Sequence, residues 1–421
     1  MLGHVKRFAW KFLNKISYIV LSSRKQQISQ NDQIVAVFVD YLDASFLLAS
    51  PKLNGKKIVL FCTHRSPLFQ MFRTGVQKKI AKVIFVENYA ENQYDFLVQS
   101  CKNNNVEVVM IQAGDFLVPA YNYVNCAIGA KGNSELAVAC SLDKGVMRAA
   151  LNSNNISPFK MLDLKSKDDI EKVDFYPCVL KPKIGTFSEG VVLLQSKDDF
   201  YHLIDEAEKQ RRKTEFETGY IVEEYIEGRQ FDVEGIVHNG ELVILSIVEE
   251  NYTGFFPYFN INWFFFNAFV GEELYNKIYD TLQRAFVACG MLHGAYHCEL
   301  RIDKNGDVRI LEFSNRMGGG FEKPISDVTG SSFADLYVES MLDILKTTAV
   351  INKNHYLLQK YFQYPEELEQ WKEYLKRANI SYSFKPLFYR GHIGMMNIYH
   401  HNKEVMLKIA QDFDLIFKTP I

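Results

Sequence analysis

Two glutamates on neighbouring predicted strands, Glu299 and Glu312, are the residues of this sequence best suited to chemistry. The dipeptide at 305–306, Asn-Gly, is the strongest short signal for a β-hairpin turn. If these two residues form the loop, counting outward places Glu299 directly opposite Glu312. Carboxylates with Cβ atoms roughly 5 Å apart repel each other unless a cation bridges them or one holds a proton. The pair predicts a Mg²⁺ site, and the alternative is a solvated hairpin face.

The same count assigns the remaining side chains to the two faces of the hairpin. It pairs Arg301 with Ile310 and His297 with Ser314. Because side chains alternate along a strand, the polar face carries His297, Glu299, Arg301, Glu312 and Ser314. The opposite, core-facing side carries Cys298, Leu300, Ile302, Leu311 and Phe313. A structural hydrogen bond and a general-base role are both open for His297. Pairing with the glutamates and a phosphate or substrate contact are both open for Arg301.

A larger α/β framework is needed to position this hairpin. Four short apolar runs read as buried strands separated by helix-like stretches, at 34–40, 57–62, 82–87 and 106–112. This alternation predicts a doubly wound parallel sheet. No Gly-x-Gly-x-x-Gly follows the first run, so a dinucleotide site is not supported. Further strands are predicted within 175–182, 221–228, 231–237 and 385–400, and helices near 272–289, 333–345 and 366–377.

The composition is that of an ordinary globular protein. A chain of 421 residues, 48% hydrophobic and 23% charged, is long enough for about two or three domains. Its net charge of −2 argues against a nucleic-acid partner. The seven cysteines are odd in number and form no Cys-x-x-Cys pair, so neither a zinc site nor a disulfide framework is indicated. A reducing, cytoplasmic compartment is the simplest inference.

Residues 1–30 differ from the rest because no acidic residue precedes Asp32 while basic and apolar residues alternate at helical spacing. They predict a basic amphipathic helix. Such a helix could lie on an anionic membrane surface, act as a targeting segment, or dock on its own protein or a partner subunit. Its charges make it unsuited to span a bilayer. The uncharged run 255–270 contains Pro257 and asparagines, which favours a buried or substrate-lining loop.

Four sequence motifs that are weak indications when taken singly occur in an order that indicates a nucleotide site. Lys181 ends a predicted strand and is followed by a glycine-rich loop at 183–191, an acidic strand turn at 221–228 and the paired carboxylates. A lysine supplies a point charge for phosphate, and backbone N–H groups of a loop can cover phosphates. Two carboxylates can hold Mg²⁺ against phosphate oxygens. In this order the segments supply the groups that ATP requires.

Over about residues 30–345 the sequence resembles the ATP-grasp superfamily, and within it the carboxylate–amine ligases of the L-amino-acid ligase type. The motifs that carry the resemblance are "GNSELAVACSLDKGVMRAAL" (132–151), "YPCVLKP" (176–182), "GTFSEGV" (185–191), "VEEYIEG" (222–228), "HCELR" (297–301) and "LEFSNR" (311–316). It implies an α/β fold in which a Rossmann-like pre-ATP-grasp domain (31–140) follows the N-terminal helix. An ATP-grasp fold (141–345), with an α+β lid at about 155–220 and an antiparallel-sheet core, then precedes a small C-terminal lobe (346–421).

The resemblance also implies roles for individual residues. The nucleotide-binding positions are Lys144, Lys181, Gly185, Ser188, Gly190, Glu223, Glu224, Ile226 and Glu227. Among them Lys144 and Lys181 would contact phosphate, and Glu224 and Ile226 would contact adenine mainly through their backbone. Glu299, Glu312 and Ser314 would surround the metal. Arg316, with Arg301, would act on the transferring phosphoryl group. The cofactors implied are ATP and Mg²⁺, with Mn²⁺ as an alternative ion.

One position departs from the family's pattern. Many members read Glu-x-Asn-x-Arg, with the asparagine as a metal ligand, whereas here Ser314 stands at that position and Asn315 follows one residue later. A shift of one residue moves a side chain to the opposite face of a strand. Ser314, directly or through water, is therefore predicted to complete the metal shell. Asn315 could do so only through a β-bulge.

The implied activity is ATP-dependent ligation. ATP phosphorylates a substrate carboxylate, and an amine displaces phosphate from the acyl phosphate. The partners would be a small carboxylate and a small amine, with a homodimer as the implied assembly. The aromatic stretch 249–269 suits either an apolar substrate side chain or core packing. Carboxylation, phosphoryl transfer to a small molecule, and a non-catalytic nucleotide-binding scaffold are the alternatives.

Overall fold

The computed structural model of the chain describes residues 14, 17, 20, 21, 28, 29 and 31–413, apart from 187, 211–218, 254–259, 269, 346–354 and 390–391. The predicted helix over residues 1–30 lies mostly outside these residues. Its described members Asn14, Ser17, Val20 and Leu21 are helical. Leu21 is buried, and the Asn14 side chain donates to the Ser66 carbonyl at 2.7 Å. These residues of the segment therefore dock on the chain itself.

The four apolar runs form a parallel sheet in the order β3-β2-β1-β4. Every residue of β1 is buried, as expected for a parallel strand covered on both faces. The strands are β1 (Ile34–Val39), β2 (Lys57–Cys62), β3 (Ile80–Phe85) and β4 (Val106–Met110). The helices of this region are α2 (Ser45–Ala49), α3 (Leu68–Thr74), α4 (Tyr94–Asn103) and α5 (Val118–Ile128). The predicted doubly wound arrangement is confirmed.

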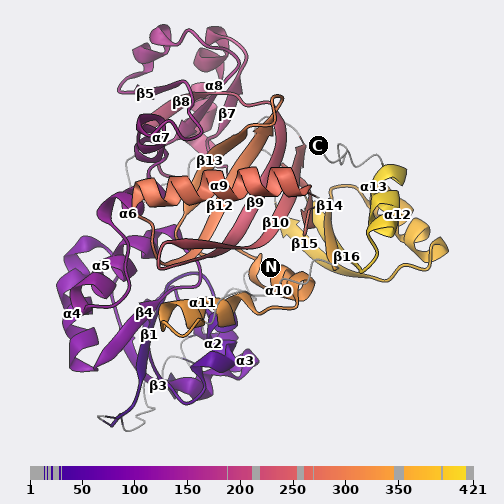
Figure 1. Cartoon of the computed structure of the whole chain (residues 1–421). Coiled ribbons are helices and arrows are strands. Elements are labelled where there is room, and N and C mark those ends of the chain that lie inside the picture. The colour runs from indigo at the N-terminus through magenta and orange to yellow at the C-terminus, as the bar shows by residue number, and fades with distance from the viewer. Residues whose placement is uncertain are drawn as a thin grey trace, which may run out of the picture.

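A small antiparallel sheet, which we call the lid sheet, has the order β5-β8-β6-β7. Its apolar side chains, among them Leu180, Phe200 and Val222, form a cluster of their own. The elements are β5 (Met161–Leu164), β6 (Cys178–Pro182), β7 (Val192–Leu194), α8 (Lys197–Gln210) and β8 (Tyr220–Glu224). The lid sheet is thus a separate packing unit, which lies at the top of the molecule in Figure 1.

The third and largest sheet has eight antiparallel strands in the order β13-β12-β9-β10-β11-β14-β16-β15. Its strands are β9 (Gly228–His238), β10 (Glu241–Thr253), β11 (Asn260–Phe266), β12 (Gly294–Asp303), β13 (Val308–Ser314), β14 (Tyr356–Phe362), β15 (Tyr382–Tyr389) and β16 (His392–His400). The helices that accompany it are α6 (Glu135–Leu142), α7 (Lys144–Ser153), α9 (Glu272–Cys289), α10 (Glu322–Thr329), α11 (Phe333–Met341), α12 (Pro365–Arg377) and α13 (Lys403–Asp412).

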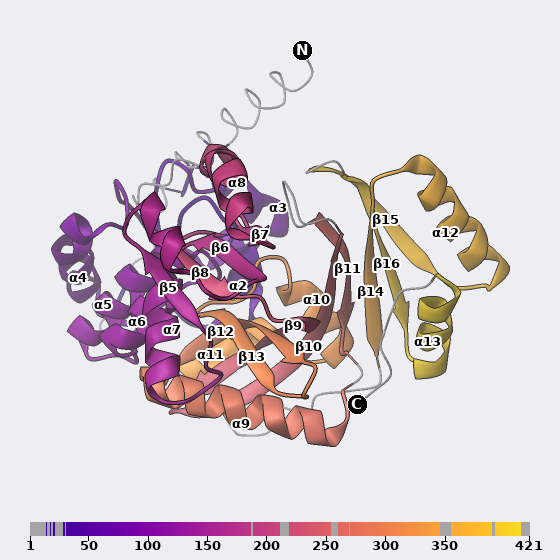
Figure 2. The same cartoon turned by 90° about the horizontal axis from the view of Figure 1, so that it is seen from above.

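Helix α9 and the lid sheet lie on opposite sides of strands β12 and β13 (Figures 1 and 2). The buried stripe of α9, with Leu274, Ile278 and Leu282, packs against the apolar face of the hairpin. That face includes Cys298 and Phe313, as the alternation of side chains predicts. The polar face of the hairpin is therefore turned toward the lid sheet, and the candidate site lies between them.

The C-terminal strands extend the central sheet. β14 pairs with β11 and β16, and β16 pairs with β15. Helices α12 and α13 cover this end through Trp371 and Met406, which share an apolar cluster with Trp263 and Phe265 of β11. The segment expected to form a C-terminal lobe is thus continuous with the main sheet. In the described part of the chain no helix combines the length and apolarity needed to cross a membrane.

Candidate active site

A cavity of about 520 Å³ lies where the lid sheet, the central sheet and the carboxyl ends of the parallel strands meet. Eleven of the predicted site residues line it: Lys144, Lys181, Gly185, Ser188, Glu223, Glu224, Ile226, Glu299, Arg301, Glu312 and Arg316. Gly190, Glu227 and Ser314 are not among the lining residues. Segments far apart in sequence therefore converge as predicted.

The hairpin register is correct at the two positions that matter most. Glu299 lies opposite Glu312, and His297 lies opposite Ser314. The predicted pairing of Arg301 with Ile310 is wrong, because Arg301 lies opposite Arg309. The reason is a longer turn, in which the Asp303 N–H donates to the Asp307 carbonyl at 3.0 Å.

A β-bulge restores the predicted register beyond the turn. The extra residue lies between Ile310 and Glu312, so that Leu311 has no partner on β12. This explains a second error, since Leu311 was predicted to face the core and instead lines the cavity. The longer turn shifts the strand by one residue and the bulge shifts it back, which leaves the two glutamates opposite each other.

Three carboxylates, one on each of three neighbouring strands, form a row across the central sheet. Asp232 of β9 lies opposite Glu299 of β12, which lies opposite Glu312 of β13. One Asp232 oxygen is buried and has no hydrogen-bond partner among the described residues. Burial and the nearby Glu250 carboxylate raise the pKa of Asp232 well above its ordinary value. The row is an arrangement of donor oxygens that favours a bound cation.

Lys144 supplies a positive charge at one end of this row. It begins α7, where the Asp143 side chain caps the helix by accepting from the N–H of Gly145 at 2.7 Å. The Lys144 Nζ lies 2.8 Å from Glu312 Oε2 and donates to the Gly185 carbonyl at 3.0 Å. Burial alone would lower the pKa of Lys144, but the Glu312 charge outweighs it and raises the pKa. Lys144 thus links the polar face of the hairpin to the glycine-rich loop at 183–191.

Glu223 lies in a buried ion triad. Its two oxygens lie 2.7 Å from Arg148 Nε and 2.6 Å from Lys181 Nζ. Burial would raise the pKa of Glu223, but these two cations hold it below its ordinary value. Arg148 also donates to the carbonyls of Ser157 and Ile310, at 3.1 and 2.5 Å. The carboxylate predicted to contact nucleotide therefore fixes Lys181, which itself reaches the cavity.

The strand turn after β8 is held by Arg301. Its guanidinium donates to the Ile226 carbonyl at 2.6 Å and to Gln230 Oε1 at 2.9 Å, and it lies over the Tyr225 ring. Neither reading left open for Arg301, pairing with the glutamates or contacting phosphate, describes these contacts. The Glu224 side chain accepts from the Lys160 N–H at 2.9 Å, and the Glu224 N–H donates to the Lys160 carbonyl at 3.1 Å.

The glycine-rich loop between β6 and β7 is a series of tight turns. Ser188 and Gly190 have positive φ, 54° and 74°, and the Val191 N–H donates to the Ser188 carbonyl at 3.3 Å. Gly185, Thr186 and Ser188 line the cavity. The loop therefore presents backbone and a hydroxyl group above the carboxylate row.

Arg316 is oriented by Asp115, which lies just beyond the carboxyl end of β4. Its Nε and Nη2 donate to the two oxygens of Asp115 at 2.8 and 3.0 Å. Ser314 Oγ donates to the same carboxylate at 2.6 Å. Burial opposes ionisation of Asp115, but Arg316 and Ser314 hold its pKa below the ordinary value. The predicted phosphoryl-contacting arginine is thus fixed, and the hydroxyl proton of Ser314 points away from the glutamates.

Asn315 lies on the opposite face of the strand, as the register predicts. Its amide is buried and donates to the carbonyls of His293 and Ala295, both at 3.0 Å. Its oxygen accepts from Asn133 at 2.7 Å and from the Tyr121 hydroxyl. No bulge turns Asn315 toward the carboxylates. It joins the central sheet to α5 and to the loop before α6.

Each ring nitrogen of His297 contacts a carboxylate. Its Nδ1 contacts the fully buried Glu234 carboxylate, and its Nε2 lies 3.6 Å from Glu299 Oε1. Burial would lower the pKa of His297, but Glu234 raises it well above the ordinary value. The second Glu234 oxygen accepts from the Gly318 N–H at 3.0 Å. The structural hydrogen bond, one of the two roles left open for His297, is therefore present with Glu234, and the contact with Glu299 is an ion pair.

Both the sequence and the fold of the chain are similar to those of known proteins. A family model described as ATP-grasp domain matches residues 174–324. Alanine–anticapsin ligase of Bacillus subtilis (strain 168) is 23% identical over 270 residues, which cover 58% of this chain and 56% of that protein. L-amino acid ligase from Bacillus licheniformis has a TM-score of 0.70 at 18% identity, covering 92% of this chain and 98% of that chain. Residues 174–324 are therefore similar to an ATP-grasp domain, and the chain as a whole shares its fold with that L-amino acid ligase.

Another solved structure with the same fold contains a nucleotide. Carboxyaminoimidazole ribonucleotide synthase from Aspergillus clavatus, complexed with ATP, has a TM-score of 0.65 at 15% identity, covering 91% of this chain and 97% of that chain. At such identities the solved structures establish the fold. The chain spans about half the length of the curated relatives that it matches.

The donor groups of this cavity fit a divalent cation with a nucleoside triphosphate. Two carboxylates, Glu299 and Glu312, face each other in a cavity that also contains cationic Lys144, Lys181 and Arg316. Mg²⁺ is commonly bound by one or two carboxylates together with substrate phosphates. An apolar wall with Phe264, Phe321 and Tyr361 closes the other end of the same cavity.

Asp115 and Arg148 escaped the sequence reasoning. Asp115 follows β4 after Gly114, at the carboxyl end of a parallel strand, where ligand-contacting residues gather. That position was the available signal. Asp232 and Glu234 alternate along β9, which places both on the face of Glu299. Arg148 offered no signal, because its burial depends on the lid sheet.

Proposed function

We propose that this chain is an ATP- and Mg²⁺-dependent ligase that joins a carboxylate, that of an amino acid, to an amine through an acyl phosphate, releasing ADP and phosphate. The observation that carries the proposal is the pair Glu299–Glu312 in one cavity with Lys144 and Arg316. The names of two similar proteins, alanine–anticapsin ligase and L-amino acid ligase, support the same chemistry.

The nucleotide would lie between the lid sheet and the central sheet. Adenine would contact the backbone of Glu224 and Ile226, whose turn is held by Arg301. Lys181, fixed by Glu223 at 2.6 Å, would carry a point charge to the phosphates. The loop with Gly185, Ser188 and Gly190 would cover them, and exposed Glu227 would reach the ribose.

Glu299 and Glu312 would hold Mg²⁺, and Ser314 would complete the shell through water, because its hydroxyl proton goes to Asp115. When bound, the ion would neutralise charge that develops on the phosphate oxygens. Lys144 would leave its 2.8 Å contact with Glu312 to meet phosphate. Mn²⁺ is the alternative ion, since carboxylate ligands also suit it.

Ligation makes two demands on the remaining residues. In the first half, an oxygen of the substrate carboxylate bonds to the terminal phosphorus, and the bond from that phosphorus to the ADP oxygen breaks. Arg316, held by both oxygens of Asp115, would stabilise the charge of the transferring group. In the second half, the amine attacks the acyl carbon, the C–O bond breaks and phosphate leaves. The closed lid would exclude water from the acyl phosphate.

The wall of the cavity supports an apolar side chain on one substrate. Phe264, predicted within the aromatic stretch 249–269, lines the cavity beside Phe321. Its neighbours Trp263 and Phe265 pack in the core instead. The part of that stretch at 254–259 lies outside the described residues. We therefore propose an amino acid with an apolar or aromatic side chain as one substrate.

The test is a turnover assay with purified protein, ATP, Mg²⁺ and a panel of amino acids and small acids, with ADP, phosphate and product mass measured. ADP and an amide product that appear only when acid and amine are both present support the ligase. A stable phosphorylated product would indicate phosphoryl transfer, and bicarbonate-dependent product would indicate carboxylation. Nucleotide binding without turnover across the panel would indicate a scaffold. Asp307→Asn, a carboxylate removed at the exposed hairpin turn, is the matched control.

The proposal extends to three wider properties of the chain: cytoplasmic location, a homodimer, and contact of residues 1–30 with an anionic membrane surface. Light scattering of the purified protein measures the assembly. Flotation with anionic vesicles, with and without residues 1–30, measures the membrane contact. Fluorescence of a tagged chain in cells measures the location.

A further inference from the structure

Glu299 has a carboxylate neighbour on each side, and the proposed Mg²⁺ accounts for one of them. Glu312 lies opposite it on β13, and Asp232 lies opposite it on β9. A cation between Glu299 and Glu312 leaves the carboxyl groups of Asp232 and Glu299 facing each other. Lys144 contacts the Glu312 end of the row. The Asp232 end therefore needs a separate explanation.

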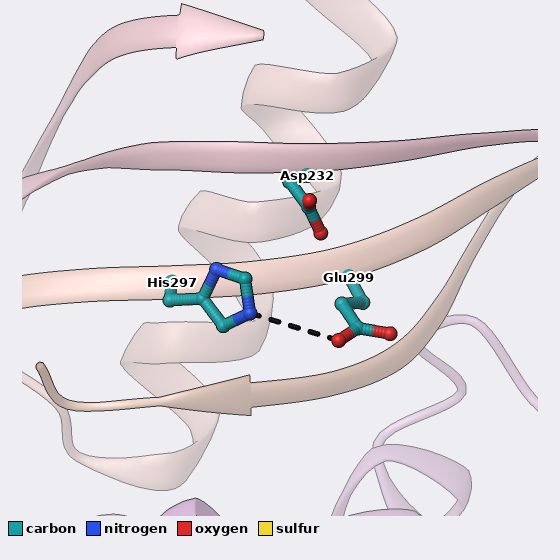
Figure 3. Close-up of side chains that lie close together, drawn as sticks. All are labelled: Asp232, His297 and Glu299. Atoms are coloured by element: carbon teal, nitrogen blue, oxygen red, sulfur yellow. Dashed lines mark ion pairs between the residues drawn. The ribbon is translucent and has the colours of Figure 1, made fainter. Parts of the chain in front are cut away.

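His297 brings a nitrogen to this end of the row. The nearest ligand atoms of Asp232, His297 and Glu299 all lie within 4.8 Å of one another. Figure 3 shows the imidazole and the two carboxylates on the same side of β9 and β12, with the His297–Glu299 contact dashed. The three side chains thus converge on a space that one ion could occupy.

The other ring nitrogen of His297 is held in the manner typical of a metal-binding histidine. Its Nδ1 contacts Glu234, whose second oxygen accepts from the Gly318 N–H at 3.0 Å. A carboxylate on one ring nitrogen fixes the tautomer and directs the lone pair of the other nitrogen to the ion. Gly318 permits this approach, because a Cβ there would lie 3.0 Å from His297 Nδ1 and 2.9 Å from the Glu234 carboxyl carbon.

An independent observation points to a missing ligand at the same place. Asp232 is 2% exposed, and in the described part of the chain its Oδ1 has no hydrogen-bond partner. Buried polar oxygens are nearly always paired, so an orphaned one needs an explanation. An ion bound between Asp232, His297 and Glu299 would supply the partner.

We propose that Asp232, His297 and Glu299 bind a divalent transition-metal ion of the Mn²⁺ class, at a position separate from the Mg²⁺ between Glu299 and Glu312. A set of one imidazole nitrogen and two carboxylates suits Mn²⁺ better than Mg²⁺, which prefers oxygen ligands. The site is complete without nucleotide, because each ligand belongs to β9 or β12. It does not rest on the ligase reaction.

The test uses the full chain without nucleotide and MnCl₂ as the probe. Electron paramagnetic resonance of free Mn²⁺ gives the stoichiometry and affinity, and pulsed measurements detect ¹⁴N coupling to the bound ion. We expect one Mn²⁺ per chain with an imidazole coupling. His297→Asn keeps an amide donor for Glu234 but removes the Nε2 ligand, and it should weaken binding at least about tenfold and abolish the coupling. Asp232→Asn should also weaken binding at least about tenfold.

Two variants separate this site from the nucleotide-linked metal. Glu312→Gln removes a carboxylate of the same row but no proposed ligand, and Asp307→Asn removes one at the exposed turn. Asp307→Asn should bind Mn²⁺ as the wild type does, and Glu312→Gln should keep the ¹⁴N coupling, which comes from His297 and not from the Glu299–Glu312 pair. Absence of bound Mn²⁺, absence of ¹⁴N coupling in the wild type, or loss of that coupling in Glu312→Gln would overturn the proposal. Because no ATP or substrate is present, these outcomes are independent of the turnover assay.

Discussion

Asn315 should stabilise the fold without contributing to metal binding. Its buried amide bridges three parts of the chain through Tyr121, Asn122, Asn133, His293 and Ala295. Asn315→Ala removes these bonds together. Asn133 keeps its 2.8 Å bond to the His293 carbonyl, so that carbonyl still has a donor. The group most affected by the substitution is the hydroxyl of Tyr121, a residue that is 1% exposed.

The magnitude follows from those contacts. A buried hydroxyl left without its acceptor costs about 1–3 kcal/mol, and the lost amide donations add about 1 kcal/mol. Asn315→Ala should therefore lower the free energy of unfolding by about 2–4 kcal/mol. Urea unfolding followed by tryptophan fluorescence, with midpoint and slope compared separately, measures the change.

A double-mutant cycle with Tyr121→Phe tests the reasoning. Because Tyr121→Phe removes the orphaned hydroxyl from the Asn315→Ala background, the double variant should be about 1–2 kcal/mol more stable than the sum of the single losses predicts. Mg²⁺ affinity should remain within about twofold of the wild type, since a lost ligand would cost far more. Additive losses, or tenfold weaker Mg²⁺ binding with unchanged stability, would refute this account of Asn315.

Three further predictions concern the cavity. Glu312→Gln should abolish turnover while the melting temperature stays close to that of the wild type, because the carboxylate is a proposed metal ligand; unimpaired turnover would remove the metal assignment. Glu223→Gln leaves two buried cations without their partner and should cost about 3–5 kcal/mol of stability in urea unfolding. Because the pKa of Glu223 lies below its ordinary 4.5, the wild type's advantage should be full above about pH 5 and shrink as the pH falls through the folded-state pKa. An advantage that grows on acidification would contradict the triad. Gly318→Ala should displace the Glu234 carboxylate, lowering the melting temperature and weakening Mn²⁺ binding. A variant with the melting temperature and Mn²⁺ affinity of the wild type would show that Glu234 does not pack tightly against Gly318.

The hairpin illustrates what a sequence can specify. Alternation and a turn signal were enough to put Glu299 opposite Glu312. The exact turn was not predictable, because a three-residue connection with Gly306 at φ 78° competes with the two-residue one. The bulge at Leu311 was not visible either, since its position depends on the neighbouring strands and the lid. The predicted register at Glu299 and Glu312 was therefore correct only because the longer turn and the bulge shift the strand by one residue in opposite directions.

Other parts of the site depend on contacts between distant segments. The partners Asp115 and Arg316 are separated by 201 residues, and Arg148 and Glu223 by 75. Strand periodicity predicts which face a side chain occupies but gives no information on which element lies opposite that face. For this reason Lys181 was identified from its motif, whereas the triad that fixes it required the structure. The same limit applies to Arg301, whose partners Ile226 and Gln230 lie across the strand turn.

The central claim is that a substrate carboxylate is activated by phosphorylation, and isotope transfer tests it most directly. An acid labelled with ¹⁸O in its carboxylate is incubated with the protein, ATP, Mg²⁺ and the amine, and the released phosphate is examined by mass spectrometry. If an acyl phosphate forms, one ¹⁸O atom passes from each carboxylate to each phosphate as the amine displaces it. Amide product accompanied by unlabelled phosphate would contradict the account.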